Sequence, residues 1–315
     1  MKLEDIKTIA VIGAGLIGQA TAVEFALGGY EVRMNSRSEE SLQRGLQGIR
    51  SILDTMVGLG ITTTGDANLA VTRIGTDDTM KSTVEDAQVI FEAVYEDLEL
   101  KQRIFRDLDR YRRHDALMVS GTSTLRLSDI ASATTSPELV VLANYSNPTY
   151  LVPLVEVLRN DKTSDETVNT LCALLTRIGK KPVVIQKDVP GFVANRLQVA
   201  LLREALHLIE QGIVTAQDID LIMRSSIGRR WAVAGIFEVF DIAGHDLTLS
   251  ASSYLMPYLD NSTEPSPVLR DKVARGELGI KTGKGFYDWT PETADALRQR
   301  IAHALVEIEK WSQGD

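Results

Sequence analysis

Residues 8–29 read TIAVIGAGLIGQATAVEFALGG, and this stretch decides the fold. Its first part is a short continuous run rich in β-branched residues, as expected for a strand that is buried on both faces of a parallel sheet. The glycines of GAGLIG follow where that strand ends, and the remainder has the spacing of a helix that stops at Gly28 and Gly29. The stretch therefore predicts a strand, a tight turn and a helix.

The three glycines of the turn, Gly13, Gly15 and Gly18, fit the G-x-G-x-x-G pattern. Gly13 permits the tight turn, Gly15 lets a pyrophosphate approach the backbone, and Gly18 lets the helix pack closely on the strand. The free N–H groups at the helix start, around Leu16 and Ile17, then face the phosphates. Because a second strand, YEVRMN, follows about one unit later, we expect a dinucleotide-binding unit and not a merely structural turn.

The end of that second strand, MNSRSEE, bears on the choice of cofactor. NAD-binding units place an Asp or Glu there to accept a hydrogen bond from the ribose 2′-hydroxyl. This chain has Asn35, followed by Ser36 and Arg37. Loss of the carboxylate removes its repulsion of a 2′-phosphate, and the Arg37 guanidinium is suited to bind one. We therefore expect NADP(H), with NAD(H) as the alternative if Arg37 is only a solvated residue at a helix start.

Strand-like and helical patterns alternate over about 190 residues, which is typical of a doubly wound sheet. Further buried strands are expected at 87–94, 116–124, 139–147 and 181–187. The later part of the chain has long apolar patterns with a period of about 3.6 residues and hardly any strand-like run. We predict an α/β, Rossmann-type domain over residues 1–190 and an all-helical domain over residues 191–315.

The composition excludes several classes of partner. The chain of 315 residues is 44% hydrophobic and carries a net charge of −9, which argues against nucleic acid and against an anionic membrane surface. Gln19 and Glu24 interrupt residues 8–29 and no basic segment precedes them, so we expect a cytoplasmic chain without a spanning helix or signal sequence. The lone Cys172 cannot form an intramolecular disulfide or a multi-thiolate site, and we expect no metal.

Six stretches carry a resemblance to a known family: VIGAGLIG, FEAVYEDLELKQRIFRDLD, SGTSTLRLSDIA, NYSNPTYLVPLVEV, KDVPGFVANRL and GELGIKTGKGFYDW. With these motifs in this order and spacing, the chain resembles the 3-hydroxyacyl-CoA dehydrogenase superfamily. Within it, the chain is similar to the short branch that acts on small substrates without CoA, such as gulonate, carnitine or pyridine-carboxylate dehydrogenases. The resemblance implies a small-molecule substrate and a homodimer in which the helical domain forms the contact.

The resemblance also implies roles for five residues of this chain. Glu96 and Lys101 lie along the cofactor, with ordinary solvated charges as the alternative. Ser123 lies where nicotinamide and substrate meet, and Asn195 lies at the reacting oxygen of the substrate. A capping or turn role is the alternative for both. Glu156 corresponds to the carboxylate that orients the catalytic histidine.

Asn144 stands twelve residues before Glu156, at the position where the family keeps that histidine. A histidine titrates near neutrality, whereas an amide offers only hydrogen bonds and cannot supply a proton. Asn144 can still stabilise a developing oxyanion through its N–H. Among the histidines of the chain, His245 is the candidate replacement acid, and Tyr145 beside Asn144 is the other.

Three functions are compatible with this substitution. Reduction of C=N needs little acid from the enzyme, because an iminium ion brings its own proton, and an unpaired Glu156 would favour a cationic ligand. We therefore expect an NADPH-dependent imine reductase that delivers hydride to a small cyclic substrate. One alternative is an NAD(P)-dependent dehydrogenase of a small 3-hydroxy acid or 3-hydroxyacyl compound, with Asn144 either natural or an inactivating replacement. The other is a catalytically silent, crystallin-like protein that only binds the cofactor.

Overall fold

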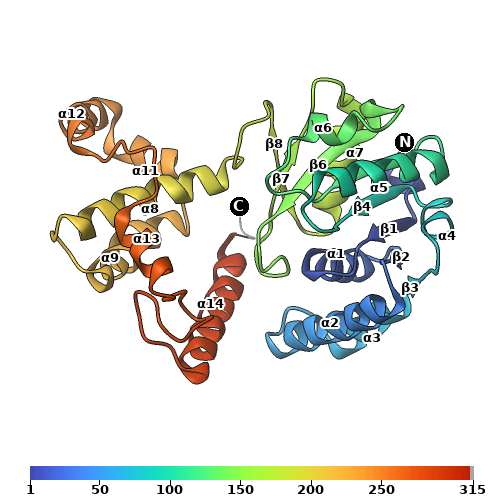
Figure 1. Ribbon diagram of the computed structural model, residues 1–315, viewed down its shortest axis with the longest axis horizontal. Coiled ribbons are helices and arrows are strands. Elements are labelled where there is room, and N and C mark those ends of the chain that lie inside the picture. Colours follow the sequence, from blue (N-terminus) through green and yellow to red (C-terminus); the bar gives the residue numbers. More distant parts are fainter. Residues whose placement is uncertain (313–315) are drawn as a thin grey trace. The chain divides into compact units, whose positions relative to one another are not determined.

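The computed structural model describes residues 1–312 and divides at Val193 into a sheet-containing unit and a helical unit (Figure 1). The predicted architectures, a doubly wound sheet followed by an all-helical part, are both confirmed. The sequence placed the boundary after residue 190, and the structure places it after Val193.

Eight strands form one sheet in the first unit, in the order β3-β2-β1-β4-β5-β6-β7-β8. The strands are β1 (Thr8–Ile12), β2 (Glu31–Asn35), β3 (Ile74–Thr76), β4 (Val89–Glu92), β5 (Leu117–Ser120), β6 (Val140–Tyr145), β7 (Leu154–Leu158) and β8 (Lys181–Ile185). The first six are parallel, whereas β7 runs antiparallel to β6 and β8 runs parallel to β7. The strand order reverses between β1 and β4, which is where doubly wound sheets bind their ligands.

Helices cover both faces of this sheet (Figure 1). One face packs against α1 (Leu16–Leu27), α2 (Glu39–Gly58), α3 (Thr64–Thr72) and α7 (Asp165–Arg177). The other face packs against α4 (Met80–Val84), α5 (Leu98–Tyr111) and α6 (Leu127–Ala131). Because both faces are covered, β4 and β5 are buried along their whole length, as their continuous apolar runs predicted.

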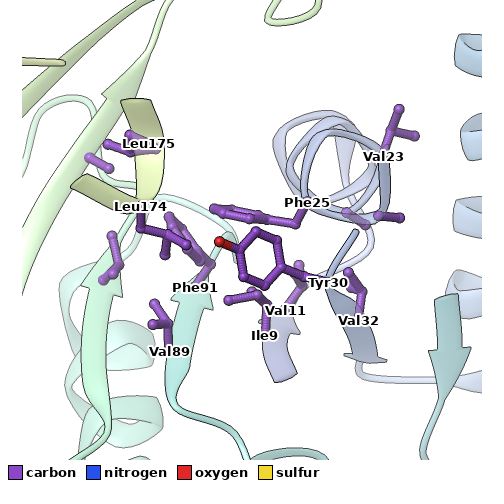
Figure 2. Packing of buried hydrophobic residues seen from close by; sticks show 14 of the residues in the cluster. Ile9, Val11, Val23, Phe25, Tyr30, Val32, Val89, Phe91, Leu174 and Leu175 are labelled. Atoms are coloured by element: carbon purple, nitrogen blue, oxygen red, sulfur yellow. The ribbon is translucent and has the colours of Figure 1, made fainter. Parts of the chain in front are cut away.

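Aromatic side chains bind α1 to the sheet (Figure 2). The ring of Phe25 packs edge-on against Tyr30, with centroids 5.9 Å apart, and lies 5.0 Å from the ring of Phe91 on β4. Figure 2 shows Leu174 and Leu175 of α7 closing the same cluster. This packing holds the N-terminus of α1, and the glycine turn before it, at the carboxyl end of β1.

The second unit is built from helices alone within the described residues. They are α8 (Ala194–Glu210), α9 (Ala216–Ile222), α10 (Gly228–Trp231), α11 (Ile236–Ala243), α12 (His245–Leu255), α13 (Pro267–Ala274) and α14 (Pro291–Ser312). A π-helical turn, Met223–Ile227, joins α9 to α10. Many apolar side chains of this unit are exposed, with Ile242 at 86% and Phe237 at 80%. None of the helices described is long and apolar enough to cross a bilayer.

Two strands were absent from the sequence prediction. β3 has three residues, too few to give a periodic signal. β7 reads LVEVL, and Glu156 interrupts its apolar run. Burial of a carboxylate requires partners, and those of Glu156 come from outside the strand, so no local pattern identifies β7.

Candidate active site

The glycine turn between β1 and α1 has the geometry that a dinucleotide site needs. Gly13 has a φ of 113°, and a Cβ there would lie 2.4 Å from the carbonyl oxygen of Ala93. A Cβ on Gly18 would lie 2.0 Å from the carbonyl oxygen of Gly13, so the close approach of α1 requires glycine. At Gly15, by contrast, no atom beyond its chain neighbours lies within 4 Å of an added Cβ. The turn is therefore tight on one side and open on the other, as the bound pyrophosphate of such turns requires.

The first turn of α1 offers backbone amides to an anion. The first hydrogen bond within this helix runs from the Gln19 N–H to the Gly15 carbonyl at 2.9 Å. The amides of Leu16, Ile17 and Gly18 precede that bond, and such amides carry partial positive charge. Leu16 is 59% exposed. These residues fit the phosphate-binding role that the sequence predicts for them.

The end of β2 places its polar residues differently. Asn35 is buried and donates its side-chain N–H to the Asp77 carbonyl at 2.9 Å, so its amide donor holds the backbone and is not directed at a ligand. Ser38 caps the start of α2, and Ser36 is half-buried. Arg37 is exposed and forms no ion pair with any residue in the described part of the chain. Arg37 is thus the group at this strand end that can bind a phosphate.

A buried ion pair joins the end of β4 to α5, and a hydrogen bond joins it to the end of β5. The ammonium of Lys101 lies 2.6 Å from Oε1 of Glu92, and both side chains are almost fully buried. Oε2 of Glu92 accepts a hydrogen bond from the Ser120 hydroxyl at 2.8 Å, and Oε1 accepts one from the Val94 N–H at 2.8 Å. The alternative that Lys101 is a solvated charge is therefore wrong, because its charge is engaged inside the unit.

Glu96 holds the loop that follows β5. Its Oε1 accepts hydrogen bonds from the Thr122 hydroxyl at 2.6 Å, the Ser123 N–H at 3.0 Å, and the N–H and hydroxyl of Thr124 at 2.9 and 2.8 Å. Burial alone would raise the pKa of Glu96, but the hydrogen bonds from Thr122 and Thr124 and the charge of Lys101 lower it from 4.5 to about 2. Glu96 therefore fixes the backbone of Ser123, the residue expected at the junction of cofactor and substrate.

Asn144 and Glu156 form a cross-strand pair. They are directly opposed in the antiparallel ladder of β6 and β7, and Asn144 donates its side-chain N–H to Oε2 of Glu156 at 3.0 Å. Oε1 of Glu156 accepts a hydrogen bond from the Val193 N–H at 2.8 Å. The Glu156 side chain is buried. The imine hypothesis required an unpaired carboxylate at Glu156, and that premise is wrong, because both oxygens accept hydrogen bonds.

The two candidate replacement acids lie in different units of the chain. Tyr145 follows Asn144 in β6 and points to the opposite face of the sheet. Burial, reinforced by the charge of Glu24, raises the pKa of the Tyr145 hydroxyl well above its usual range, which makes it a poor proton donor. His245 begins α12 in the helical unit, where it is exposed and lies 3.0 Å from an Asp241 carboxylate oxygen. Asn195 is exposed in the first turn of α8, as its helix-start position predicted.

A separate cavity of about 660 Å³ lies within the helical unit, between α8, α9, α13 and the segment 277–289. Four of the polar side chains in its wall form two pairs. The Tyr287 hydroxyl donates to Asp220 at 2.7 Å, and Lys272 lies 3.0 Å from Glu277. The cavity contains none of the predicted site residues, so we place the chemistry at the carboxyl edge of the sheet.

Sequence reasoning missed the polar residues that organise this edge, Glu92 and Ser120. The sequence does contain a pattern that could have identified both residues. Each ends a strand that is otherwise apolar, VIFE and LMVS, and the ends of parallel strands meet at one edge of a sheet. Val193 could not be found in this way, because it contributes only a backbone N–H.

Comparison with known proteins identifies relatives over the whole length of the chain. The 3-hydroxyacyl-CoA dehydrogenase NAD binding domain matches residues 8–189, and the C-terminal domain of the same family matches residues 191–289. The 5-formyl-3-hydroxy-2-methylpyridine 4-carboxylate 5-dehydrogenase of Mesorhizobium japonicum is 33% identical over 312 residues, which cover 98% of this chain and 99% of the relative. L-carnitine dehydrogenase of Oceanobacillus iheyensis is 32% identical over 278 residues, covering 86% and 89%.

A solved structure agrees with these relatives. The crystal structure of a 5-formyl-3-hydroxy-2-methylpyridine 4-carboxylic acid 5-dehydrogenase, described as an NAD+ dependent dismutase, superimposes with a TM-score of 0.87 at 33% identity. It covers 98% of this chain and 99% of the other. All three comparisons name dehydrogenases. They give no support to imine reduction or to a preference for NADP(H), and the dehydrogenase alternative fits them better.

Two substitutions in the glycine turn should separate folding from cofactor binding. Gly18→Ala brings a Cβ against the Gly13 carbonyl, so we expect the free energy of unfolding to fall by about 2 kcal/mol, measured by urea titration. Gly15→Ala meets no atom, so the protein should keep its stability and yet bind NAD(P)H at least tenfold more weakly, measured by cofactor fluorescence. Unchanged cofactor affinity in Gly15→Ala would refute the phosphate site.

The depressed pKa of Glu96 predicts a pH-dependent contribution to stability. The ionised carboxylate stabilises the fold above the reference pKa of 4.5, and that contribution is lost as the pH falls toward about 2. Glu96→Gln should therefore be less stable than the wild type at neutral pH, and the gap should close as the pH drops through this range. The exposed Glu99→Gln, in the same segment, is the matched control. A gap that stays constant with pH would contradict the loop-holding role.

Proposed function

The chain belongs to the 3-hydroxyacyl-CoA dehydrogenase family and is a nicotinamide-dependent oxidoreductase, and we propose that it oxidises or reduces a small acid that carries no coenzyme A. The relatives named for a pyridine carboxylate and for L-carnitine support such a substrate. The first of them matches this chain almost from end to end, α14 included.

The observation that carries the proposal is the Asn144–Glu156 pair at the end of β6. Because β6 is parallel to β1, its carboxyl end lies at the same edge of the sheet as the open glycine turn. A cofactor whose pyrophosphate binds at the turn extends along this edge. The loop with Ser123, held by Glu96, lies between the two positions in the strand order.

The cofactor, Asn144 and Glu156 have different roles in the interconversion of an alcohol and a carbonyl compound. The cofactor, when bound, accepts or donates the hydride. Asn144 has one N–H fixed by Glu156, which leaves its oxygen and its second N–H to orient the substrate oxygen. The side-chain amide of Asn144 cannot take up the proton that the substrate hydroxyl releases. A carboxylate has about four lone-pair sites, and we assign the proton to a water molecule that hydrogen-bonds to Glu156.

Arg37 supports acceptance of NADP(H) in addition to NAD(H). A guanidinium that is exposed and free of carboxylate partners can form charge-assisted, bidentate hydrogen bonds with a ribose 2′-phosphate. Asn35 adds no negative charge at this strand end, so it does not repel the phosphate. Its fixed orientation toward Asp77 keeps the strand end rigid.

The helical unit supports a homodimer. Its exposed apolar side chains include Phe237, Ile242, Leu247, Leu249 and Tyr254. An apolar surface of this kind is typical of a contact between copies.

An activity panel tests the proposed function. Absorbance of the reduced cofactor is followed with small hydroxy acids and oxo acids, pyridine aldehyde carboxylates, a 3-hydroxyacyl-CoA and a cyclic imine. We expect turnover of a small acid, with kcat/KM above that for the CoA thioester. We also expect Asn144→His to raise kcat for alcohol oxidation by about 10²-fold, because an imidazole held by Glu156 takes up the proton directly. Asn169→His, on the exposed face of α7, is the matched control.

Several results would overturn this proposal. The highest turnover with the cyclic imine would restore the reductase hypothesis, and the highest turnover with the CoA thioester would remove the small-acid assignment. Cofactor binding without turnover of any compound would identify a silent, crystallin-like protein. A loss of about 10²-fold in His245→Gln would identify His245 as the acid and exclude the water held by Glu156.

Arg37→Ala tests the cofactor preference. Loss of a charge-assisted contact of about 1.5 to 3 kcal/mol should raise KM for NADP(H) roughly tenfold or more and leave KM for NAD(H) within about twofold. The control is Arg44→Ala on α2, an exposed arginine that pairs with Glu40, which should change neither value. Equal effects on both cofactors would show that Arg37 does not recognise the 2′-phosphate.

A further inference from the structure

The first unit contains a second buried ion pair, on the face of the sheet opposite to Asn144 and Glu156. The ammonium of Lys180, just before β8, lies 2.7 Å from Oε1 of Glu24 in the middle of α1. The two side chains are 7% and 6% exposed. Burying two charges costs several kcal/mol per ion unless both are well partnered. A pair retained at this cost, away from the proposed site, calls for a structural reason.

The reason lies in the other contacts of Lys180. Its ammonium also donates to the carbonyl of Thr149 at 2.6 Å and lies 3.5 Å from the carbonyl of Val152. Both carbonyls belong to the segment 146–153, which connects β6 to β7. Burial raises the pKa of Glu24, and the neighbouring charge of Lys180 opposes that rise. One ammonium therefore joins three elements: α1, the segment 146–153 and the start of β8.

These three elements hold the parts of the proposed site. α1 begins at the glycine turn, and the segment 146–153 directly links the strand of Asn144 to the strand of Glu156. We propose that Lys180 and Glu24 are positioning residues for hydride transfer, which fix the Asn144–Glu156 pair relative to the cofactor-binding turn. This inference rests on the proposed function. Small displacements matter at such a site, because a shift of about 1 Å can slow a reaction about 10²-fold.

Paired apolar substitutions separate positioning from stability. Removing one partner leaves a buried charge unpaired and is strongly destabilising, whereas replacing both with apolar residues of similar size is often neutral. The double variant Glu24→Leu, Lys180→Met should therefore keep a melting temperature within a few degrees of the wild type. We expect its kcat to fall tenfold or more, because the carbonyls of Thr149 and Val152 lose their donor, and its Kd for NAD(P)H to change less than about twofold.

The control is another largely buried ion pair, between Arg112 and Asp109. It lies at the end of α5, which returns to the amino edge of the sheet, away from the proposed site. The double variant Asp109→Leu, Arg112→Met should alter stability without lowering kcat. If the Glu24 and Lys180 variant does not fold, Glu24→Gln with Lys180→Met is measured instead, with the same expectation, because it too leaves no buried charge and no donor at position 180.

Hydrogen exchange separates this inference from the proposed function. Amides of the segment 146–153 should exchange about tenfold faster in the double variant than in the wild type, whether or not a substrate is known, while amides of α5 keep their rates. A double variant with wild-type kcat, or with unchanged exchange in this segment, overturns the positioning role. Absence of wild-type turnover with every compound of the panel overturns the proposed function instead, and faster exchange in the variant would then still show that Lys180 holds the segment.

Discussion

A carboxylate removed from water needs a cation or several hydrogen-bond donors, and this requirement organises the carboxyl edge of the sheet. Glu92 meets it with the Lys101 ammonium and a serine hydroxyl. Glu96 meets it with the backbone and hydroxyls of the loop after β5. Glu156 meets it with Asn144 and with the N–H of Val193. In each case the contacts of one carboxylate connect separate segments of the chain, so these contacts fix the segments relative to one another.

The same requirement applies on the opposite face of the sheet, where Glu24 and Lys180 neutralise one another. Here the cation also satisfies backbone carbonyls of the β6–β7 connection, which would otherwise be buried without a donor. The two faces therefore constrain the same pair of strands from both sides. Hydrophobic packing, which includes the contact between Phe25 of α1 and Phe91 of β4, is favourable for folding, but it is not directional. The contacts of Glu156, Glu24 and Lys180 are directional, and they constrain how β6, β7 and the connection between them lie relative to one another.

The sequence predicts those parts of the molecule that depend on local sterics and composition. Gly13 and Gly18 identify the turn because a side chain at either position would overlap the backbone. The continuous apolar runs of β4 and β5 identify buried strands for a similar reason. The burial of Lys101 and of Glu156 could not be predicted in this way. Their burial depends on partners 9 to 37 residues away, and no periodic pattern reveals a partner at that separation. Distances of this kind are set by the folded chain and not by the segment.

The register of β6 and β7 also shows what an asparagine at position 144 has in common with a histidine there. Side chains directly opposed on an antiparallel pair have Cβ atoms about 5 Å apart. An imidazole at position 144 would donate one N–H to Glu156 and present its second nitrogen to the substrate. The Asn144 amide makes the same bond to Glu156 and presents its oxygen or second N–H. Asparagine thus offers contacts on the same two sides as a histidine would, but without a group that titrates near neutrality. Under the proposed function, such a pair can still align the substrate for hydride transfer, and the proton has to pass through another group.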